Sequence, residues 1–276
     1  MITIGFIGAG ITGTSVAVRL HQQGYCVAAV SSRTLASAER LARRIEGCQV
    51  YKTAQEVANE SQLVFITTPD DIIGEVASRV RWRKGQSVVH CSGAHSTDIL
   101  AAAKQFGATT GCFHPLQTFA SVEQAMVNLP GSTFAIEADE PLLPILQEMA
   151  EALACHWVIL TAADKVLYHA AAIFACNYLV TLVKLAADLW KDFGVPQEQA
   201  INALLPLLRG TLSNIEKIGL PDCLTGPIAR GDLGTIKKHL EALEKESPHL
   251  LNSYKQLGLQ TIPIALNKGK LDPEKA

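Results

Sequence analysis

The sequence predicts an α/β fold, in which a doubly wound domain with a parallel sheet is followed by an all-helical C-terminal domain. Three observations support this prediction. Short apolar runs rich in β-branched residues alternate with helical patterns over the first half of the chain. A glycine-rich turn follows the first of these runs. Beyond about residue 160 only helical patterns remain. Strands that are buried on both faces and joined by amphipathic helices form parallel sheets.

The expected strands are short apolar runs bounded by turn residues. They cover residues 2–8, 26–32, 61–68, 86–93 and 108–115, and the runs 132–138 and 156–160 extend the same sheet. Helical patterns lie between the first five strands, at residues 11–24, 35–47, 70–81 and 96–107. Each connection is therefore strand–helix–strand, which is the unit of a parallel sheet.

The second half of the chain is expected to be helical throughout. The helices cover residues 164–193, 196–218, 231–246 and 247–269. Gly194 ends the first of them, and Asp232 and Ser247 are the expected N-caps of the last two. We therefore expect two domains, a sheet domain at residues 1–160 and a helical domain at residues 161–276.

Composition argues against several classes of protein. The 276 residues are 48% hydrophobic and 18% charged, which is enough to bury a large core. The net charge is −2 and no basic run occurs, so a nucleic acid partner is not expected. The apolar stretch at residues 170–183 contains Asn177 and ends at Lys184. We therefore do not expect it to span a membrane.

The seven cysteines are scattered and form no Cys-x-x-Cys pair. This pattern is typical of buried thiols in a reducing compartment, rather than of a disulfide framework or a zinc site. The chain also starts directly in an apolar run, without the charged region of a signal peptide. We therefore expect a cytoplasmic protein without a bound metal.

The turn after the first strand has the spacing Gly-x-Gly-x-x-Gly, formed by Gly8, Ala9, Gly10, Ile11, Thr12 and Gly13. Between a strand and a helix, such glycines allow a tight turn and a close approach of the backbone to a pyrophosphate at the helix N-terminus. The position of the motif predicts a Rossmann dinucleotide-binding domain. The alternative is a glycine-rich turn that binds nothing.

The end of the second strand indicates which dinucleotide is bound. NAD sites place an acidic residue there for the ribose hydroxyls, but this chain has Ser31, Ser32 and Arg33. Hydroxyls with a guanidinium suit a 2′-phosphate, so the sequence predicts NADP(H); the alternative is that the serines only cap the next helix and Arg33 is solvated. Thr67, Thr68 and Pro69, at the end of the third predicted strand (61–68), are expected beside the cofactor because ligands bind at the carboxyl ends of the strands.

Four residues are candidates for the chemistry. Ser92 and His114 follow or end neighbouring strands, which places them over the same cleft. Lys165 and His169 lie on one face of the long helix, together with Tyr168. His90, which ends the strand before Ser92, is a further possible site residue, and the alternative for it is a histidine satisfied at the sheet end. The alternative for the helix face is packing alone.

Three further residues are candidates for substrate binding. Asn177 is a polar residue in an apolar stretch and needs a partner if it is buried. Arg230 lies in a glycine- and proline-rich loop, where its guanidinium could bind a substrate carboxylate, and Asp232 follows it. The alternative for Arg230 is an ordinary solvated surface residue.

Five motifs occur in order along the chain: GxGxxG at 8–13, SSR at 31–33, FHPLQTF at 113–119, YHAAAxFxxN at 168–177 and LTGPIARGD at 224–232. With them the chain resembles reductases that join a Rossmann domain to a helical C-terminal domain: pyrroline-5-carboxylate reductase, the β-hydroxyacid dehydrogenases, prephenate dehydrogenase and deazaflavin-dependent NADP reductases. It is most similar to an uncharacterised branch of that superfamily, with a C-terminal domain of unknown function.

The resemblance implies roles for several residues. His114 resembles the histidine of the His-Pro motif of prephenate dehydrogenases, which contacts the substrate hydroxyl during hydride transfer. Ser92 lies roughly where those enzymes have a serine that orients this histidine. Lys165 and His169 resemble a helix motif of the β-hydroxyacid dehydrogenases, in which the lysine handles the proton. The resemblance also implies a homodimer formed through the helical domain.

Together these observations predict an NADP(H)-dependent dehydrogenase or reductase. Its substrate is expected to be a small carbonyl or alcohol compound that carries a carboxylate. Residues 1–160 would bind the dinucleotide, and residues 161–276 would bind substrate and dimerise. Two alternatives stay open: an imine reductase of the pyrroline-5-carboxylate reductase type, and a non-catalytic NADP(H) sensor.

Overall fold

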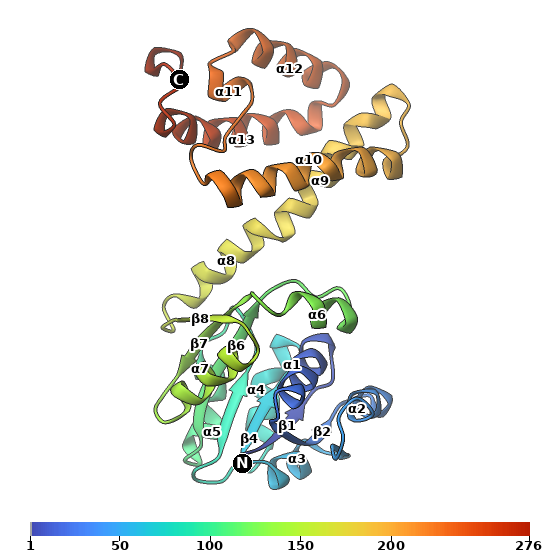
Figure 1. Cartoon of the computed structure of the whole chain (residues 1–276), viewed down its shortest axis with the longest axis vertical. Coiled ribbons are helices and arrows are strands. Elements are labelled where there is room, and N and C mark those ends of the chain that lie inside the picture. Colours follow the sequence, from blue (N-terminus) through green and yellow to red (C-terminus); the bar gives the residue numbers. More distant parts are fainter. Residues whose placement is uncertain (1) are drawn as a thin grey trace. The chain divides into compact units, whose positions relative to one another are not determined.

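The computed structural model describes residues 2–276 and divides into two compact units (Figure 1). The first unit ends at Cys176 and the second covers Asn177–Ala276. The expected boundary near residue 160 lies one helix earlier, because α8 (Lys165–Ala175) is part of the first unit. Its first residue, Lys165, is buried there.

Within the described residues, the first unit contains one eight-stranded sheet with the order β3-β2-β1-β4-β5-β6-β7-β8. The strands are β1 (Thr3–Ile7), β2 (Cys26–Ser31), β3 (Gln49–Val50), β4 (Leu63–Ile66), β5 (Ser87–His90), β6 (Thr109–Leu116), β7 (Thr133–Ala138) and β8 (His156–Ile159). The chain starts at β1, runs outward to β3 and continues at β4 on the other side of β1. The strand order therefore reverses beside β1, which is where such sheets bind their ligands.

Helices cover both faces of this sheet (Figure 1). They are α1 (Ile11–Gln22), α2 (Leu35–Ala42), α3 (Ala54–Glu60), α4 (Asp70–Arg79), the 3₁₀ turn η1 (Thr97–Leu100), α5 (Ala101–Gln105), α6 (Val122–Asn128) and α7 (Leu142–Ala152). Residues of α1, α2 and α7 join one buried cluster with Phe6 of β1, and residues of α3, α4 and α5 join another with Ile7. Adjacent residues of a strand face opposite sides of the sheet. The predicted doubly wound α/β fold is thus confirmed.

One strand pair departs from the parallel sheet that the sequence predicted. The parallel pairing of β5 and β6 ends at His90 and Cys112, whereas β6 continues to Leu116 as the antiparallel partner of β7. An antiparallel neighbour can start at the edge where the previous strand ends, so the chain need not cross the sheet. The extension carries His114 beyond the last parallel pair.

The sequence patterns missed β3, α3, α6 and α7. β3 has only two residues, so it shows no period. Helix α3 is short and polar, but it does have a sequence signal, because Thr53 and Glu56 form a capping box. The side chain of Thr53 accepts a hydrogen bond from the backbone of Glu56, and the Glu56 carboxylate accepts one from the backbone of Thr53. A search for this motif would have found the helix.

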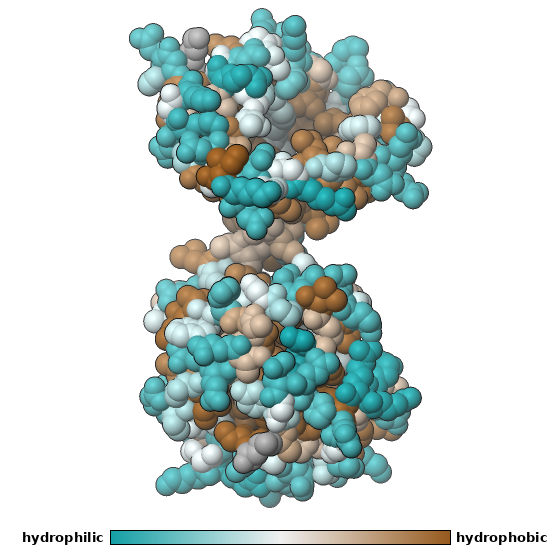
Figure 2. Space-filling view, viewed as in Figure 1, coloured by the Kyte–Doolittle hydropathy of each residue, from teal (hydrophilic) through white to brown (hydrophobic). Residues whose placement is uncertain are grey.

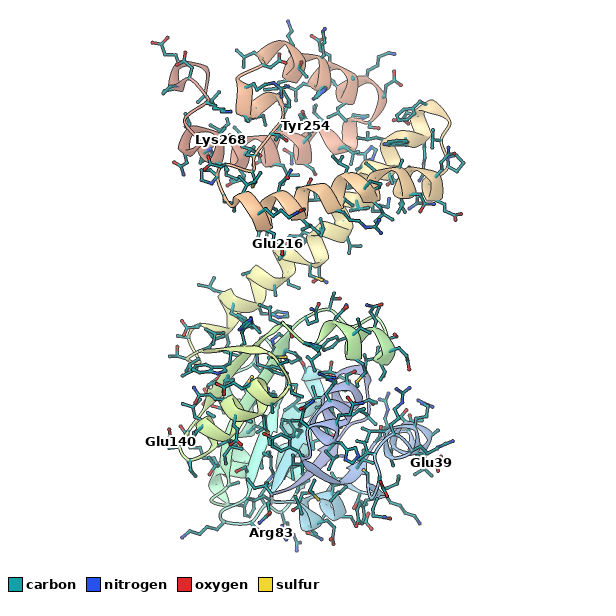
Figure 3. All side chains as sticks on the ribbon, viewed as in Figure 1. Glu39, Arg83, Glu140, Glu216, Tyr254 and Lys268 are labelled. Carbon is teal, nitrogen blue, oxygen red and sulfur yellow. The ribbon has the colours of Figure 1, made fainter. Side chains whose placement is uncertain are left out.

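The second unit is helical, as predicted. It contains α9 (Asn177–Leu189), the 3₁₀ turn η2 (Trp190–Phe193), α10 (Gln197–Ile218), α11 (Pro227–Arg230), α12 (Leu233–Glu246), α13 (Pro248–Asn267) and the 3₁₀ turn η3 (Pro273–Lys275). Helix α9 contacts α10, and α13 contacts both α11 and α12. Lys268, at the end of α13, donates hydrogen bonds to the backbone oxygens of Asp222 and Leu224 and so holds the loop before α11 (Figure 3).

The predicted helix ends of this unit are largely confirmed. Gly194 ends the first helical stretch in the left-handed conformation, with φ of 80°. Asp232 caps α12 by accepting a hydrogen bond from the backbone of Thr235. Ser247 precedes α13, but its hydroxyl donates to the carboxylate of Asp192 and makes no cap bond. Ser247 therefore takes the predicted N-cap position of α13, but it makes no side-chain cap bond because its hydroxyl is bound to Asp192.

One helical stretch of the described residues, Lys165–Phe193, is long and apolar enough to cross a membrane by length and composition. It is longer than the run considered in the sequence, because it includes all of α8, α9 and η2. The stretch begins with the buried Lys165 and divides between the two units after Cys176. Length and composition alone do not show that a helix crosses a membrane, so the absence of a membrane span stays a prediction.

Candidate functional site

The glycine loop between β1 and α1 packs tightly against the end of β4. A Cβ atom on Gly8, whose φ is +110°, would lie 2.7 Å from the backbone of Thr67, and one on Gly13 would lie 2.3 Å from the Thr67 hydroxyl oxygen. That hydroxyl donates a hydrogen bond of 2.9 Å to the backbone oxygen of Gly8. Only glycine fits at these two positions without a shift.

Gly10, unlike Gly8 and Gly13, borders open space at the N-terminus of α1. Nothing lies within 4 Å of the position that its Cβ would take, and it is the N-cap of α1 without a side-chain cap bond. The first turn of α1 therefore presents backbone N–H groups toward open space. A helix N-terminus of this kind binds phosphate groups.

A cavity of about 570 Å³ opens beside this loop. It is lined by predicted cofactor residues from three segments, namely Gly8, Ala9, Gly10, Ser31, Ser32, Arg33, Thr67, Thr68 and Pro69. Ile11, Thr12 and Gly13, in the first turn of α1, are not among its lining residues. The hydroxyl oxygen of Thr68 is buried and has no hydrogen-bond partner among the described residues. A polar ligand in the cavity would supply one.

Two cationic side chains line the cavity, those of Arg33 and Lys52. Arg33 is exposed, and Lys52 lines the same cavity, together with the carboxylate of Glu75. Thr34, rather than either serine, takes the N-cap position of α2. Sequence reasoning missed Lys52 because it follows the two-residue strand β3. Its signal is its place after the carboxyl end of the strand next to β2.

His90, at the end of β5, is a structural residue. Its Nδ1 accepts a hydrogen bond from the backbone of Ser92, and its Nε2 lies 3.2 Å from the backbone oxygen of Ser96. Burial, and to a lesser extent the charge of Lys165, lowers its pKa to about 3. Both ring nitrogens are therefore used within a neutral imidazole.

His114 lies on the extension of β6, and its Nδ1 is 2.8 Å from the hydroxyl of Tyr168 on α8. Burial lowers the pKa of His114 to about 4, helped by the charges of Lys165 and His169. Burial also raises the pKa of Tyr168 far above its usual value. Both groups are thus neutral near pH 7, and they are joined by a hydrogen bond.

Lys165 lies beneath these rings and is 1% exposed. Its Nζ is 2.8 Å from the Cys112 thiol and 3.3 Å from the backbone oxygen of Ser92, to which it donates. Burial raises the pKa of Cys112 to about 11, although the neighbouring Lys165 acts in the opposite direction. The Lys165 amine therefore contacts a thiol and a carbonyl oxygen, and it has no ion pair with a carboxylate among the described residues.

Ser92 has other partners than the resemblance implied. Its hydroxyl donates a hydrogen bond of 2.6 Å to the carboxylate of Asp70, at the start of α4, and lies 3.2 Å from Nδ1 of His95. In the described part of the chain it makes no hydrogen bond to His114. Its expected role in orienting His114 is thus corrected, because Asp70 draws its side chain toward α4 and the Tyr168 hydroxyl occupies Nδ1 of His114.

His169 completes the cluster. Its Nδ1 is buried and has no hydrogen-bond partner among the described residues. The His114 and His169 rings lie 6.4 Å apart, centroid to centroid, nearly perpendicular to each other. The structure therefore brings together the predicted residues His114, Lys165 and His169 at the carboxyl edge of the sheet, with Tyr168 as an added member.

The other three candidates, Asn177, Arg230 and Asp232, belong to the second unit. Asn177 and Arg230 are exposed. The carboxylate of Asp232 is engaged by Thr235, whose side chain and backbone hydrogen bonds lower its pKa. Their part in substrate binding stays a prediction.

Two family models match the chain. Residues 1–115 match a Rossmann-like domain, and residues 132–261 match a domain of unknown function, DUF2520. The predicted combination of a Rossmann domain with a C-terminal domain of unknown function is thus confirmed. Inositol 2-dehydrogenase 4 from Saccharopolyspora erythraea is 38% identical over 72 residues, which are 25% of this chain and only 21% of that enzyme.

Solved structures share the fold over nearly the whole length. A protein from Bacteroides fragilis, provisionally described as an NADP oxidoreductase, is 27% identical with a TM-score of 0.77, and the match covers 95% of this chain and 98% of that one. A reductive aminase from Aspergillus terreus, solved with NADPH and ethyl-5-oxohexanoate, is 15% identical with a TM-score of 0.71, over 99% and 97% of the two chains. The second likeness concerns the fold alone.

Proposed function

We propose that this protein is an NADP(H)-dependent oxidoreductase, which transfers a hydride between nicotinamide C4 and a carbon that bears oxygen in a small substrate. One observation carries the proposal. The cavity beside the glycine loop and the His114 cluster lie at the same edge of one sheet, at the carboxyl ends of β1, β4, β5 and β6. Cofactor and substrate meet at this edge in doubly wound domains.

The residues of the cavity fit a dinucleotide phosphate. Gly10 leaves the first turn of α1 open for the pyrophosphate, and the cavity is also lined by Thr68, whose hydroxyl oxygen is buried without a hydrogen-bond partner among the described residues. Arg33 and Lys52 supply two cations where NAD-specific domains have an acidic residue. When bound, NADP(H) supplies or accepts the hydride.

The residues around His114 would handle the substrate oxygen and its proton. His114 is the first candidate, because its imidazole is neutral near pH 7 and faces the edge of the sheet. A neutral imidazole can polarise a carbonyl as a hydrogen-bond donor. Lys165 and His169 are the alternative proton carriers, and the buried charge of Lys165 also keeps the neighbouring imidazoles neutral.

The helical unit would add substrate binding and dimerisation. Arg230 is exposed and could anchor a substrate carboxylate. Apolar side chains are exposed on α9 and α10, among them Val180, Leu207 and Leu212. Figure 2 shows hydrophobic surface on the helical unit. Exposed apolar surface of this kind marks an interaction site. We therefore propose a homodimer through the helical unit, in an enzyme of the cytoplasm.

Turnover of NADPH with a panel of small ketones, alcohol–NADP⁺ pairs and cyclic imines tests the proposal. We expect turnover with a ketone or its alcohol, and its loss in His114→Ala with unchanged NADPH affinity. Turnover with imines alone, undiminished in His114→Ala, would favour the imine reductase reading. Tight NADPH binding without any turnover would favour a sensor.

A further inference from the structure

Another cavity lies within the helical unit, between α11, α12 and α13. Its volume is about 360 Å³. Small-molecule sites usually have volumes of about 300–1,000 Å³, so this one suits a small ligand. Most of its lining side chains are apolar, and they include Ile228, Leu233, Ile236, Leu240, Leu259 and Ile262. None of the described lining residues belongs to the first unit, so this cavity is separate from the one beside the glycine loop.

The walls of this cavity are fixed by hydrogen bonds made outside it. Asp232 caps α12 and so fixes the start of the helix that carries Ile236 and Leu240. Lys268, at the end of α13, binds two backbone oxygens of the loop before α11 (Figure 3). Leu271 follows Lys268, is only 6% exposed and lines the cavity as well. The cavity is therefore preformed.

Two polar side chains line the cavity, and they differ in what they can offer a ligand. The hydroxyl of Tyr254 lies 2.7 Å from Nδ1 of His239, so it is already engaged and its ring serves as an apolar wall. Lys255 is exposed and is the one charged side chain among the described residues that line the cavity. In the described part of the chain it makes no ion pair. Its aliphatic stem can lie along the wall while its ammonium group stays in water at the rim.

We propose that this cavity binds a small apolar carboxylate, such as a medium-chain aliphatic acid, with its hydrocarbon chain among the apolar side chains and its carboxylate at the ammonium group of Lys255. The bound chain removes apolar surface from water and supplies dispersion contacts to the walls. A polar ligand would leave its hydrogen-bonding groups unpaired there, and Lys255 would repel a cation. The site goes beyond the proposed hydride transfer and does not depend on it.

A small molecule is favoured over a second copy of the chain as the occupant. The exposed apolar side chains that we assign to the dimer interface, Val180, Leu207 and Leu212, belong to α9 and α10. No residue of either helix lines the cavity in the described part of the chain. Lysine is also depleted in protein–protein interfaces, whereas a single cation at the rim suits a ligand with one anionic group.

The first test is a titration of the nucleotide-free full chain with octanoate and with octylammonium, which have aliphatic chains of the same kind and opposite charges. The protein carries ¹³C-labelled isoleucine methyl groups, and the signals of Ile228, Ile236 and Ile262 report on the cavity. We expect octanoate to shift these three signals together and saturably, while Ile4, buried in the first unit, does not respond. Octanoate should bind about fivefold more tightly than octylammonium, which is the size expected for one exposed ion pair.

A second test removes the charge at the rim. Lys255→Gln should weaken octanoate binding and abolish the difference between the two probes, because the aliphatic chain then decides the affinity alone. Lys217→Gln is the matched control, since Lys217 is also exposed in the helical unit but does not line the cavity. It should keep the preference for octanoate.

A third test fills the cavity. The position of a Cβ atom on Gly258, in α13, has one neighbour within 4 Å, the Ile228 side chain at an ordinary 3.6 Å. Gly258→Leu should therefore be accepted by the fold and abolish the response to octanoate. Gly234→Leu is the matched control on α12, where the Cβ position meets only Asp232 at 3.7 Å and lies outside the cavity lining.

The proposal is overturned if octanoate leaves the three isoleucine signals unmoved, if octylammonium binds as tightly, or if Gly258→Leu still responds to octanoate. It is also overturned if these signals move with protein concentration instead, which would assign the cavity to a second copy of the chain. If Gly258→Leu does not fold, the probe pair and Lys255→Gln decide the question. None of these measurements involves nucleotide or turnover, so this site and the oxidoreductase function can fail independently.

Discussion

At the residue scale, the site holds the amine of Lys165 close to the imidazoles of His90 and His114, and the two imidazoles stay uncharged near pH 7. Lys165 is buried beneath His114, with a thiol and a carbonyl oxygen as its contacts. Its charge adds to burial in lowering the pKa values of His90 and His114. The polar core of the site therefore contains the buried amine of Lys165 and the neutral imidazoles of His90 and His114.

A first prediction concerns the proton donor. His114→Ala should reduce kcat by about 10²–10⁴-fold, which is the usual contribution of a positioned acid or base. NADPH affinity should be unchanged, because His114 does not line the cavity beside the glycine loop. His95→Ala is the control, since His95 is exposed and bonds to Ser92 instead. Equal losses in both variants would contradict the assignment.

A second prediction concerns acid stability. The pKa of His114 is lowered from 6.5 to about 4 in the folded protein. Below pH 6.5 the unfolded chain therefore binds a proton that the folded chain does not, and the free energy of unfolding falls as the pH falls toward 4. One such group contributes a slope of about 1.4 kcal/mol per pH unit. Urea unfolding across this range should show a smaller slope for His114→Gln than for the unmodified protein. An equal slope would mean that His114 is not buried in its neutral form.

At the element scale, two glycines of the loop between β1 and α1 are expected to have different roles: Gly13 in the stability of the fold and Gly10 in the binding of NADPH. Gly13→Ala places a methyl group 2.3 Å from the Thr67 hydroxyl, so it should destabilise the fold by about 1–3 kcal/mol. Gly10→Ala meets nothing within 4 Å and should leave stability unchanged, yet it should weaken NADPH binding by blocking the pyrophosphate. Thermal unfolding and a binding titration of both variants measure the two effects. A Gly10→Ala variant that binds normally would exclude this loop as the phosphate site.

The sequence predicted the elements that have a clear period. The buried strands β1, β2, β4, β5 and β6, and the helices between them other than α3, were expected where they occur, because continuous apolar runs and amphipathic patterns are local signals. The antiparallel pairing of β7 with β6 and the two-residue strand β3 were not predicted, since both depend on pairing with segments that are distant in the sequence. Lys52 was missed together with β3.

In the candidate site, too, features with a local sequence signal could be predicted and contacts between distant segments could not. Its members could be named from strand ends and helix spacing, as for His114 and His169. Their partners could not be named. Asp70 as the acceptor for Ser92, and the packing of the His114 and His169 rings against Gly93, depend on which loops meet in three dimensions.

At the scale of the whole molecule, the exposed apolar side chains of α9 and α10 require cover. If a second copy supplies it, Leu207→Glu, at a position 66% exposed, should shift the protein from dimer to monomer in analytical ultracentrifugation. Val127→Glu, at a position 74% exposed on α6 in the first unit, is the matched control and should leave the dimer intact. A monomeric unmodified protein would contradict the proposed assembly.

The central claim is that the chain is an NADP(H) enzyme, and a fluorescence titration with NADPH and NADH at fixed salt tests it most directly. We expect NADPH to bind at least about tenfold more tightly, a difference of about 1.4 kcal/mol, and Arg33→Ala to remove that preference. Lys52→Ala should reduce it as well. If neither nucleotide binds, the glycine loop is only structural, and the oxidoreductase assignment, with the role of His114, is wrong.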